Sequence, residues 1–296
     1  MNSQSAYHRI VMLLGLLMLP ALTLAGESTV DSVASNDGSM IYYEMAGEGA
    51  PALVFVHCWS CDRNYWREQI DRFSADHRVV AIDLAGHGES GLGRKAWTMA
   101  AYGSDVVAVL NKLDLYDVVL IGHSMGGLVV LEATRQAPER VQAIIGIDNF
   151  QDFTLKFPPE QIAAFLAPFD GDFESTTKAF VGSIVGPNTD SAVKSFIIED
   201  MASAPPEVAV PSIGNVVGYD YTPILKDIHI PIRTISSSLR PTNVEKNRML
   251  DPDFEVDFIE DVGHFPMLEN PEMFDRVLAR VIEEMTGDAK TAEAEE

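Results

Sequence analysis

The sequence predicts an α/β fold: a mostly parallel, doubly wound sheet that carries a helical insertion. Two observations predict it. From residue 52 to residue 148, short continuous apolar runs alternate with amphipathic helical stretches, and the same alternation resumes at residue 230. Continuous apolar runs are typical of strands buried on both faces, and their alternation with helices implies parallel pairing through right-handed crossovers. Residues 150–222, between the two parts, lack this alternation.

The first part of the predicted core, residues 26–149, opens with a β-hairpin. Asp37 and Gly38 form a turn dipeptide between two segments rich in β-prone residues, at 29–35 and 40–45. The alternation then follows. The strands expected are 52–57, 78–84, 118–121 and 141–148, and the helices are 64–74, 99–113 and 128–137.

Residues 150–222 are expected to form a helical lid, with proline pairs marking its breaks. An insertion between two strands of an open α/β sheet is expected over the carboxyl ends of the strands, where ligands bind. The second part of the core covers residues 223–285. Its expected strands are 230–237 and 254–260, and its expected helices are 242–250 and 271–285. The acidic tail, 286–296, is expected to be disordered.

The first 25 residues have the features of a signal peptide. His8 and Arg9 precede an apolar run at 10–19, and small residues stand before a cleavage site after Ala25. The alternative is an uncleaved anchor, but this run is shorter than the ~20 residues that a spanning helix needs. We therefore expect export to the periplasm or the medium, with no stable membrane anchor after cleavage.

The charge and the motifs exclude several classes of function. The formal net charge is −23, which argues against nucleic-acid binding and against adhesion to anionic membranes. No sequence pattern typical of a metal site or of a phosphate-binding loop occurs. We expect a well-solvated acidic surface and neither a metal nor a cofactor.

The hexapeptide Gly122-His123-Ser124-Met125-Gly126-Gly127 carries the strongest chemical signal. It follows an apolar strand and precedes a helix, which is the setting where G-x-S-x-G holds a serine on a sharp turn as an exposed nucleophile. Gly122 and Gly126 are needed because a side chain at either position would collide with neighbouring backbone.

Three further segments accompany this elbow. Residues 54–57 end one strand, residues 83–90 follow the next, and Gly263-His264-Phe265-Pro266 follows the last. With the elbow, they resemble the α/β-hydrolase family in its lid-bearing form, over residues 40–285. The resemblance implies the fold, the chemistry of a serine hydrolase and a catalytic triad.

By this resemblance Ser124 is the nucleophile and His264 is its base, since the serine hydroxyl needs a proton acceptor at neutral pH. The oxyanion hole is expected to use the backbone amides of Met125 and Trp59. The other histidines near these segments are not expected to act as the base. His57 and His87 are read as structural, and His123 is expected to point away from the base.

The acid of the triad departs from the family pattern. The family usually carries it after the strand that follows the lid, where this chain has Arg240. Some members carry it after the preceding strand, which here leads into Asp148. Asp148 is therefore the candidate that would fix the tautomer of His264. A lid-hinge role is its alternative, and Asp83 is read as a turn residue. The weaker candidates are Asp220, Asp251 and Asp253.

Cys58 and Cys61 form a C-x-x-C motif beside the oxyanion loop. The surrounding chain does not fit a thioredoxin-like redox protein. The family usually has glycine at the position of Cys58. An exported protein meets an oxidising compartment, where a disulfide would stiffen the loop. The alternative is a pair of small, reduced, packed side chains.

The resemblance implies a hydrolase that cleaves an ester-type bond of a small molecule through an acyl-enzyme, and the signal-like segment implies that it is exported. Lactonase, thioesterase, perhydrolase and carbon–carbon bond hydrolase activities stay open, and so does a non-catalytic small-ligand binder on the same fold. The lid phenylalanines are expected either to line an apolar acyl pocket or to form the core of the lid. They are Phe150, Phe153, Phe157, Phe165, Phe169, Phe173 and Phe180.

Overall fold

The computed structural model describes residues 28–292, and the predicted signal peptide lies outside these residues. It contains one eight-stranded sheet in the order β1-β2-β4-β3-β5-β6-β7-β8. β2 pairs antiparallel with β1 and β4, and the other neighbours are parallel, so the predicted sheet is confirmed. The strands are β1 (Thr29–Ala34), β2 (Met40–Ala46), β3 (Leu53–Val56), β4 (Val79–Ile82), β5 (Val118–His123), β6 (Val141–Ile147), β7 (Ile232–Ser237) and β8 (Glu255–Ile259).

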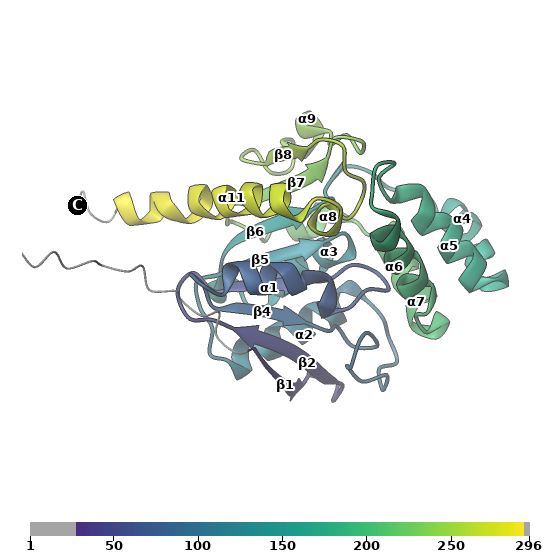
Figure 1. Ribbon diagram of the computed structural model, residues 1–296, viewed down its shortest axis with the longest axis horizontal. Helices are drawn as coiled ribbons and strands as arrows, with labels where there is room; N and C mark the ends of the chain where they lie inside the picture. Colours follow the sequence, from purple (N-terminus) through teal and green to yellow (C-terminus); the bar gives the residue numbers. More distant parts are fainter. Residues whose placement is uncertain (1–27, 293–296) are drawn as a thin grey trace, which may run out of the picture.

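Helices cover both faces of the sheet, with α1 and α11 on one face and α2 and α3 on the other (Figure 1). These helices are α1 (Arg67–Phe73), α2 (Met99–Lys112), α3 (Met125–Gln136) and α11 (Pro271–Ala292). Short helices complete the core: α8 (Tyr221–Leu225), α9 (Val244–Asn247) and α10 (Pro266–Glu269), with 3-10 turns η1 (Arg63–Trp66) and η2 (Pro138–Arg140). Every residue of β3, β4 and β5 is buried, as the continuous apolar runs predict for central parallel strands.

Four helices form the insertion between β6 and β7, and they lie together beyond one end of the sheet (Figure 1). They are α4 (Pro159–Gly171), α5 (Phe173–Ile184), α6 (Ser191–Ala202) and α7 (Pro206–Val217). All four begin with a side-chain cap or a proline: Pro159 and Pro206 open α4 and α7, and Asp172 and Asp190 cap α5 and α6. Because β6 runs into the insertion, these helices lie at the carboxyl ends of the parallel strands.

Two expectations about the second half of the core are wrong. The helix expected at 242–250 is only the single turn α9, because Asn243 caps it and the chain turns again before Pro252. The tail expected to be disordered from residue 286 instead continues α11 to Ala292, since a helix that is already packed extends at little cost. Residues 293–296 lie outside the described part of the chain.

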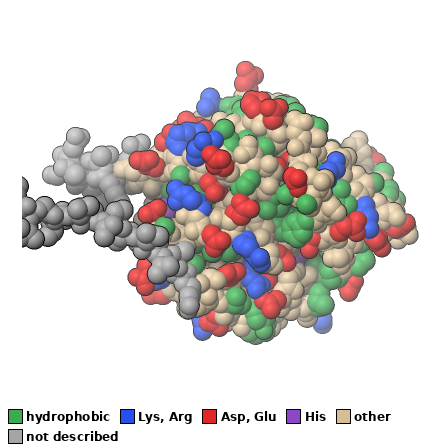
Figure 2. All heavy atoms as spheres, in the orientation of Figure 1, with side chains coloured by type: hydrophobic (Ala, Val, Ile, Leu, Met, Phe, Trp, Pro, Cys, Tyr) green, Lys and Arg blue, Asp and Glu red, His purple; other side chains and the backbone are tan. Residues whose placement is uncertain are grey.

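The acidic side chains are spread over the surface, with Lys and Arg between them, on the face that Figure 2 shows. In residues 28–292, no helix combines the length and the apolar character that a membrane crossing requires.

Candidate active site

Ser124 occupies the sharp turn between β5 and α3. Its φ of 52° and ψ of −114° are strained for a residue with a side chain. A Cβ added at Gly122 would lie 2.3 Å from the Gly126 carbonyl oxygen, and one at Gly126 would lie 2.4 Å from that of Val56. Both predicted glycines are therefore required. Ser124 is half-buried between fully buried neighbours, so its hydroxyl reaches the surface of the turn.

Asp148 and His264 meet at the carboxyl edge of the sheet. Asp148 Oδ2 lies 2.5 Å from His264 Nδ1, and both side chains are buried. The Ser237 amide donates to Asp148 Oδ1 at 2.9 Å, which fixes the carboxylate from β7. The Nδ1–H of His264 donates to the carboxylate, so Nε2 carries the lone pair that a base needs. The structure brings together the two residues that the sequence analysis paired.

The weaker carboxylate candidates serve other purposes. Asp220 caps α8 and forms an ion pair with Lys156 at 2.7 Å. Asp251 and Asp253 line a cavity of about 570 Å³ at the start of β7, the opposite end of that strand from Ser237. Among the described residues, Asp148 is the acid in contact with His264.

Arg240 reaches the same carboxylate. Its Nε lies 3.1 Å from Asp148 Oδ2, and its side chain is 38% exposed. In the sequence, Arg240 stands where the family usually has its acid, and its ion pair with Asp148 was not predicted. The signal was present in the sequence: a cation at the position of a missing acid points to a neighbouring acid that it can pair with.

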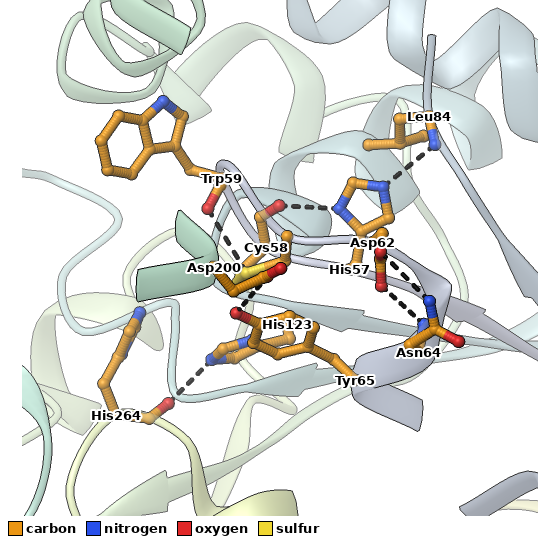
Figure 3. Close-up of a disulfide and its surroundings, with 11 residues drawn as sticks. His57, Cys58, Trp59, Asp62, Asn64, Tyr65, Leu84, His123, Asp200 and His264 are labelled. Carbon is orange, nitrogen blue, oxygen red and sulfur yellow. Dashed lines mark hydrogen bonds between the residues drawn. A yellow bond between two sulfur atoms is a disulfide. The ribbon is translucent and has the colours of Figure 1, made fainter. Parts of the chain in front are cut away.

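His123 corrects one expectation. Its ring does not point away from the base: the centroids of the His123 and His264 rings are 4.8 Å apart, and His123 Nε2 lies 2.7 Å from the His264 carbonyl oxygen (Figure 3). Burial lowers the pKa of His123 well below its ordinary value. The neutral ring therefore donates Nε2–H to that carbonyl and supports the loop that carries His264.

The loop after β3 carries the predicted oxyanion donor. A disulfide joins Cys58 to Cys61 with 5.3 Å between the Cα atoms, and Trp59 and Ser60 lie within the closed loop (Figure 3). Met125 starts α3 directly after Ser124. Within residues 28–292, neither the Trp59 amide nor the Met125 amide donates a hydrogen bond to another protein group. Both amides are thus free to donate to a ligand. Of the two alternatives for Cys58 and Cys61, the structure has the disulfide and not the reduced pair.

The side chain of Trp59 enters the insertion. Its indole Nε1–H donates to the Ala209 carbonyl oxygen of α7 at 2.7 Å. Its ring meets three phenylalanines of α4 and α5 edge to face, with centroid distances of 5.7, 6.2 and 6.1 Å to Phe169, Phe173 and Phe180. The loop and the insertion are therefore packed as one unit.

The seven phenylalanines of residues 150–180 differ in their surroundings. Phe150 and Phe153 are fully buried against Tyr221, and Phe153 also packs on Phe254, so this pair belongs to the core. Phe157 is 41% exposed. The remaining four surround Trp59 or each other, and they are Phe165, Phe169, Phe173 and Phe180.

A buried polar layer supports the oxyanion loop from below. His57 Nδ1 donates to the Cys58 carbonyl at 2.7 Å, and its Nε2 accepts from the Leu84 amide at 3.0 Å. Asp83 accepts from the Arg63 and Glu89 amides at 2.7 and 3.0 Å, which holds the following turn as predicted. The structural reading of His57 is confirmed. No group of three His, Cys, Asp or Glu side chains in residues 28–292 is arranged to hold a metal ion.

This fold and site are similar to those of known proteins. The family profile described as alpha/beta hydrolase fold matches residues 51–186. A pimeloyl-acyl-carrier-protein methyl ester esterase of Yersinia enterocolitica is 26% identical and aligns with 80% of this chain and 95% of its own. A karrikin insensitive 2 receptor of Petunia hybrida is 23% identical, over 82% of this chain and 94% of its own.

Two further matches complete this comparison. A solved structure described as an N-acyl homoserine lactone degrading enzyme has a TM-score of 0.72 at 27% identity, and the match covers 84% of this chain and 99% of that one. The acetyltransferase component of an acetoin cleaving system from Pseudomonas putida is 39% identical over 103 residues, and this chain spans only 28% of that protein's length.

The chain has the α/β hydrolase fold, which confirms this part of the resemblance. Esterases and other hydrolases recur among the matches that span the whole fold, and the protein is a hydrolase.

Proposed function

We propose that the protein is an exported serine hydrolase that cleaves ester bonds of small molecules with Ser124, His264 and Asp148. One observation carries the proposal: Asp148 holds His264 Nδ1 at 2.5 Å, at the sheet edge where the strained turn presents Ser124. A nucleophile, a base and an orienting acid are what acyl transfer needs from a protein.

The reaction follows from these groups. Ser124 Oγ attacks the ester carbonyl carbon while His264 Nε2 takes the hydroxyl proton. The oxyanion of the tetrahedral intermediate accepts hydrogen bonds from the Trp59 and Met125 amides, each worth about 2.7–4 kcal/mol in related sites. The intermediate collapses to the acyl-enzyme as His264 returns the proton to the departing alcohol. Water, deprotonated by His264, then releases the acid and restores Ser124.

A lactone is the second candidate substrate, because a cyclic ester presents the same carbonyl to the same groups. The lactone-degrading structure at 27% identity favours it, as the methyl ester esterase favours acyclic esters. A non-catalytic small-ligand binder is the third candidate, and the similarity to the receptor favours it.

The proposal of export depends on the signal-like features of residues 1–25, and the Cys58–Cys61 disulfide supports it because disulfides persist in oxidising compartments. Fractionation of cells that produce the full chain, with N-terminal sequencing of the product, tests this proposal. We expect a mature chain that begins at Gly26. A full-length chain retained in the cytoplasm would contradict export.

Labelling by a fluorophosphonate tests the enzyme proposal. We expect one adduct on Ser124 in the native protein and none in Ser124→Ala or in the acid-denatured protein. Ser203→Ala, a serine on the rim of the insertion, is the matched control and should label fully. A panel of esters and lactones of graded acyl length then identifies the substrate. Absence of both an adduct and turnover would favour the small-ligand binder.

A further inference from the structure

We infer that Arg240 is a positioning residue of the site: it shares the Asp148 carboxylate with His264 and offsets part of the stabilisation that this carboxylate gives to the protonated form of the base. The inference rests on the proposed function, because it concerns the base of that reaction. Arg240 contacts the acid and not the substrate, so it acts through Asp148.

His264 and Arg240 both contact the same oxygen of Asp148. Asp148 Oδ2 lies 2.5 Å from His264 Nδ1 and 3.1 Å from Arg240 Nε, while Oδ1 accepts from the Ser237 amide. The Arg240 contact is within ion-pair distance, but its alignment does not satisfy a hydrogen bond. Arg240 therefore interacts with Asp148 through charge alone. The hydrogen bond to Oδ2 comes from His264.

The turn after β7 holds Arg240 in place. The Arg240 amide donates to the Ser237 carbonyl at 3.1 Å, and Ser237 itself donates to Asp148. The side chain carboxylate of Asp148 is fully buried, whereas Arg240 remains partly exposed. The buried carboxylate accepts from the Ser237 amide of this turn, so it cannot turn away from Arg240 without breaking that hydrogen bond.

No other titratable group described around Asp148 and His264 supplies the positive charge that Arg240 supplies. From β5, His123 is kept neutral by burial. From α10, Glu269 accepts from the amides of Gly263 and Phe265 on either side of His264. His57 is buried beneath the oxyanion loop, and burial lowers its pKa as well. Among the described groups that face the pair, Arg240 is thus the permanent cation.

The direction of the effect follows from electrostatics. A carboxylate stabilises the imidazolium form of its histidine, and a permanent cation beside that carboxylate offsets part of this stabilisation. Removing the positive charge should therefore move the loss of activity on acidification to a higher pH. For a partly exposed cation at this distance, we expect a shift of about half to one pH unit.

The experiment measures kcat/KM against pH from 5 to 9 for wild type, Arg240→Gln and Arg240→Lys. Arg276→Gln, an exposed arginine of α11 that makes the same change in net charge, is the matched control. We expect the acid midpoint of Arg240→Gln to rise by about half to one pH unit, a loss of roughly 3- to 10-fold at the acid end. Arg240→Lys and Arg276→Gln should keep the wild-type midpoint. Far-UV circular dichroism at each pH restricts the comparison to folded protein.

A uniform loss of activity at every pH, with an unmoved midpoint, would show a structural role and overturn the inference. An equal shift in Arg276→Gln would overturn it too, since net charge alone would then explain the result. The rate of fluorophosphonate labelling of Ser124, followed over the same pH range, separates the two proposals. Labelling with an unmoved midpoint in Arg240→Gln overturns only this inference, and no labelling at any pH overturns it together with the proposed function.

Discussion

The indole of Trp59 donates a hydrogen bond of 2.7 Å to the carbonyl oxygen of Ala209, and so joins the oxyanion loop to helix α7 of the insertion. The same residue supplies one of the two backbone amides proposed to stabilise the oxyanion. A displacement of the insertion would therefore act on the loop through this side chain, and the position of the insertion and the reactivity of the site are expected to change together.

Trp59→Phe should test this coupling. The substitution removes one hydrogen bond to the buried carbonyl of Ala209, which costs about 0.5–1.5 kcal/mol. Trp66→Phe is the matched control, because Trp66 is equally buried but its Nε1–H has no partner among the described residues. Urea unfolding should show a larger loss of stability for Trp59→Phe than for Trp66→Phe, together with a lower kcat. Equal losses in the two variants would contradict a role for the hydrogen bond.

Asp148→Asn should lower kcat/KM by about 10²- to 10⁴-fold, because an amide keeps the shape of the carboxylate but does not stabilise the imidazolium and favours the wrong tautomer of His264. Steady-state kinetics on the best ester of the panel measures this loss. Asp251→Asn, at a half-buried acid near the other end of β7, should retain activity. Near wild-type activity in Asp148→Asn would mean that another carboxylate orients His264.

Gly122→Ala should abolish labelling of Ser124 and destabilise the protein, because its Cβ would lie 2.3 Å from the backbone oxygen of Gly126, which cannot move without opening the elbow. Gly171→Ala makes the same chemical change where no atom lies within 4 Å of the new Cβ. Thermal unfolding and labelling should leave Gly171→Ala close to wild type. An active, stable Gly122→Ala protein would show that the turn differs from the one described.

Reduction of the Cys58–Cys61 disulfide should loosen the oxyanion loop, lower kcat and remove roughly 2 kcal/mol of stability, the loop-closure contribution of so short a loop. Alkylation without reductant, followed by mass spectrometry, should find no modified cysteine, and the double variant Cys58→Ala/Cys61→Ala should match the reduced enzyme. Two alkylated thiols in the untreated protein would rule out the disulfide.

His87 should make stability depend on pH. Burial lowers its pKa from the ordinary 6.5 to about 3, so the folded protein keeps it neutral while the unfolded chain protonates it. The stability it contributes is complete above pH 6.5 and is lost as the pH falls toward 3, at about 1.4 kcal/mol per pH unit. Urea unfolding at several pH values should show wild type losing stability relative to His87→Gln as the pH falls.

Many carboxylates titrate in the same range, so the comparison with the variant isolates the histidine. His229→Gln, at an exposed histidine, is the control and should follow wild type at every pH. A constant difference in stability between wild type and His87→Gln would contradict the depressed pKa of His87.

The local features of the site were predictable because they depend on neighbours in the sequence. The elbow needs a strand, two glycines and a helix in order, and all three are visible in residues 118–137. The pairing of Asp148 with His264 was predicted from the family resemblance, and it agrees with the rule that the carboxyl ends of parallel strands meet at one edge of a sheet. The single-turn α9 and the extended α11 were missed, since capping and packing set the ends of helices more than composition does.

By itself the sequence determined the parallel sheet, the strained serine turn and the loops that meet at its edge, because periodic burial and turn chemistry act over a few residues. Only the tertiary structure decided what surrounds them: that Arg240 shares the oxygen that holds His264, that His123 supports the His264 loop, and that Trp59 enters the insertion. These contacts join residues that lie far apart in the chain, and their partners are chosen by side-chain packing and charge in three dimensions, which leave no period in the sequence.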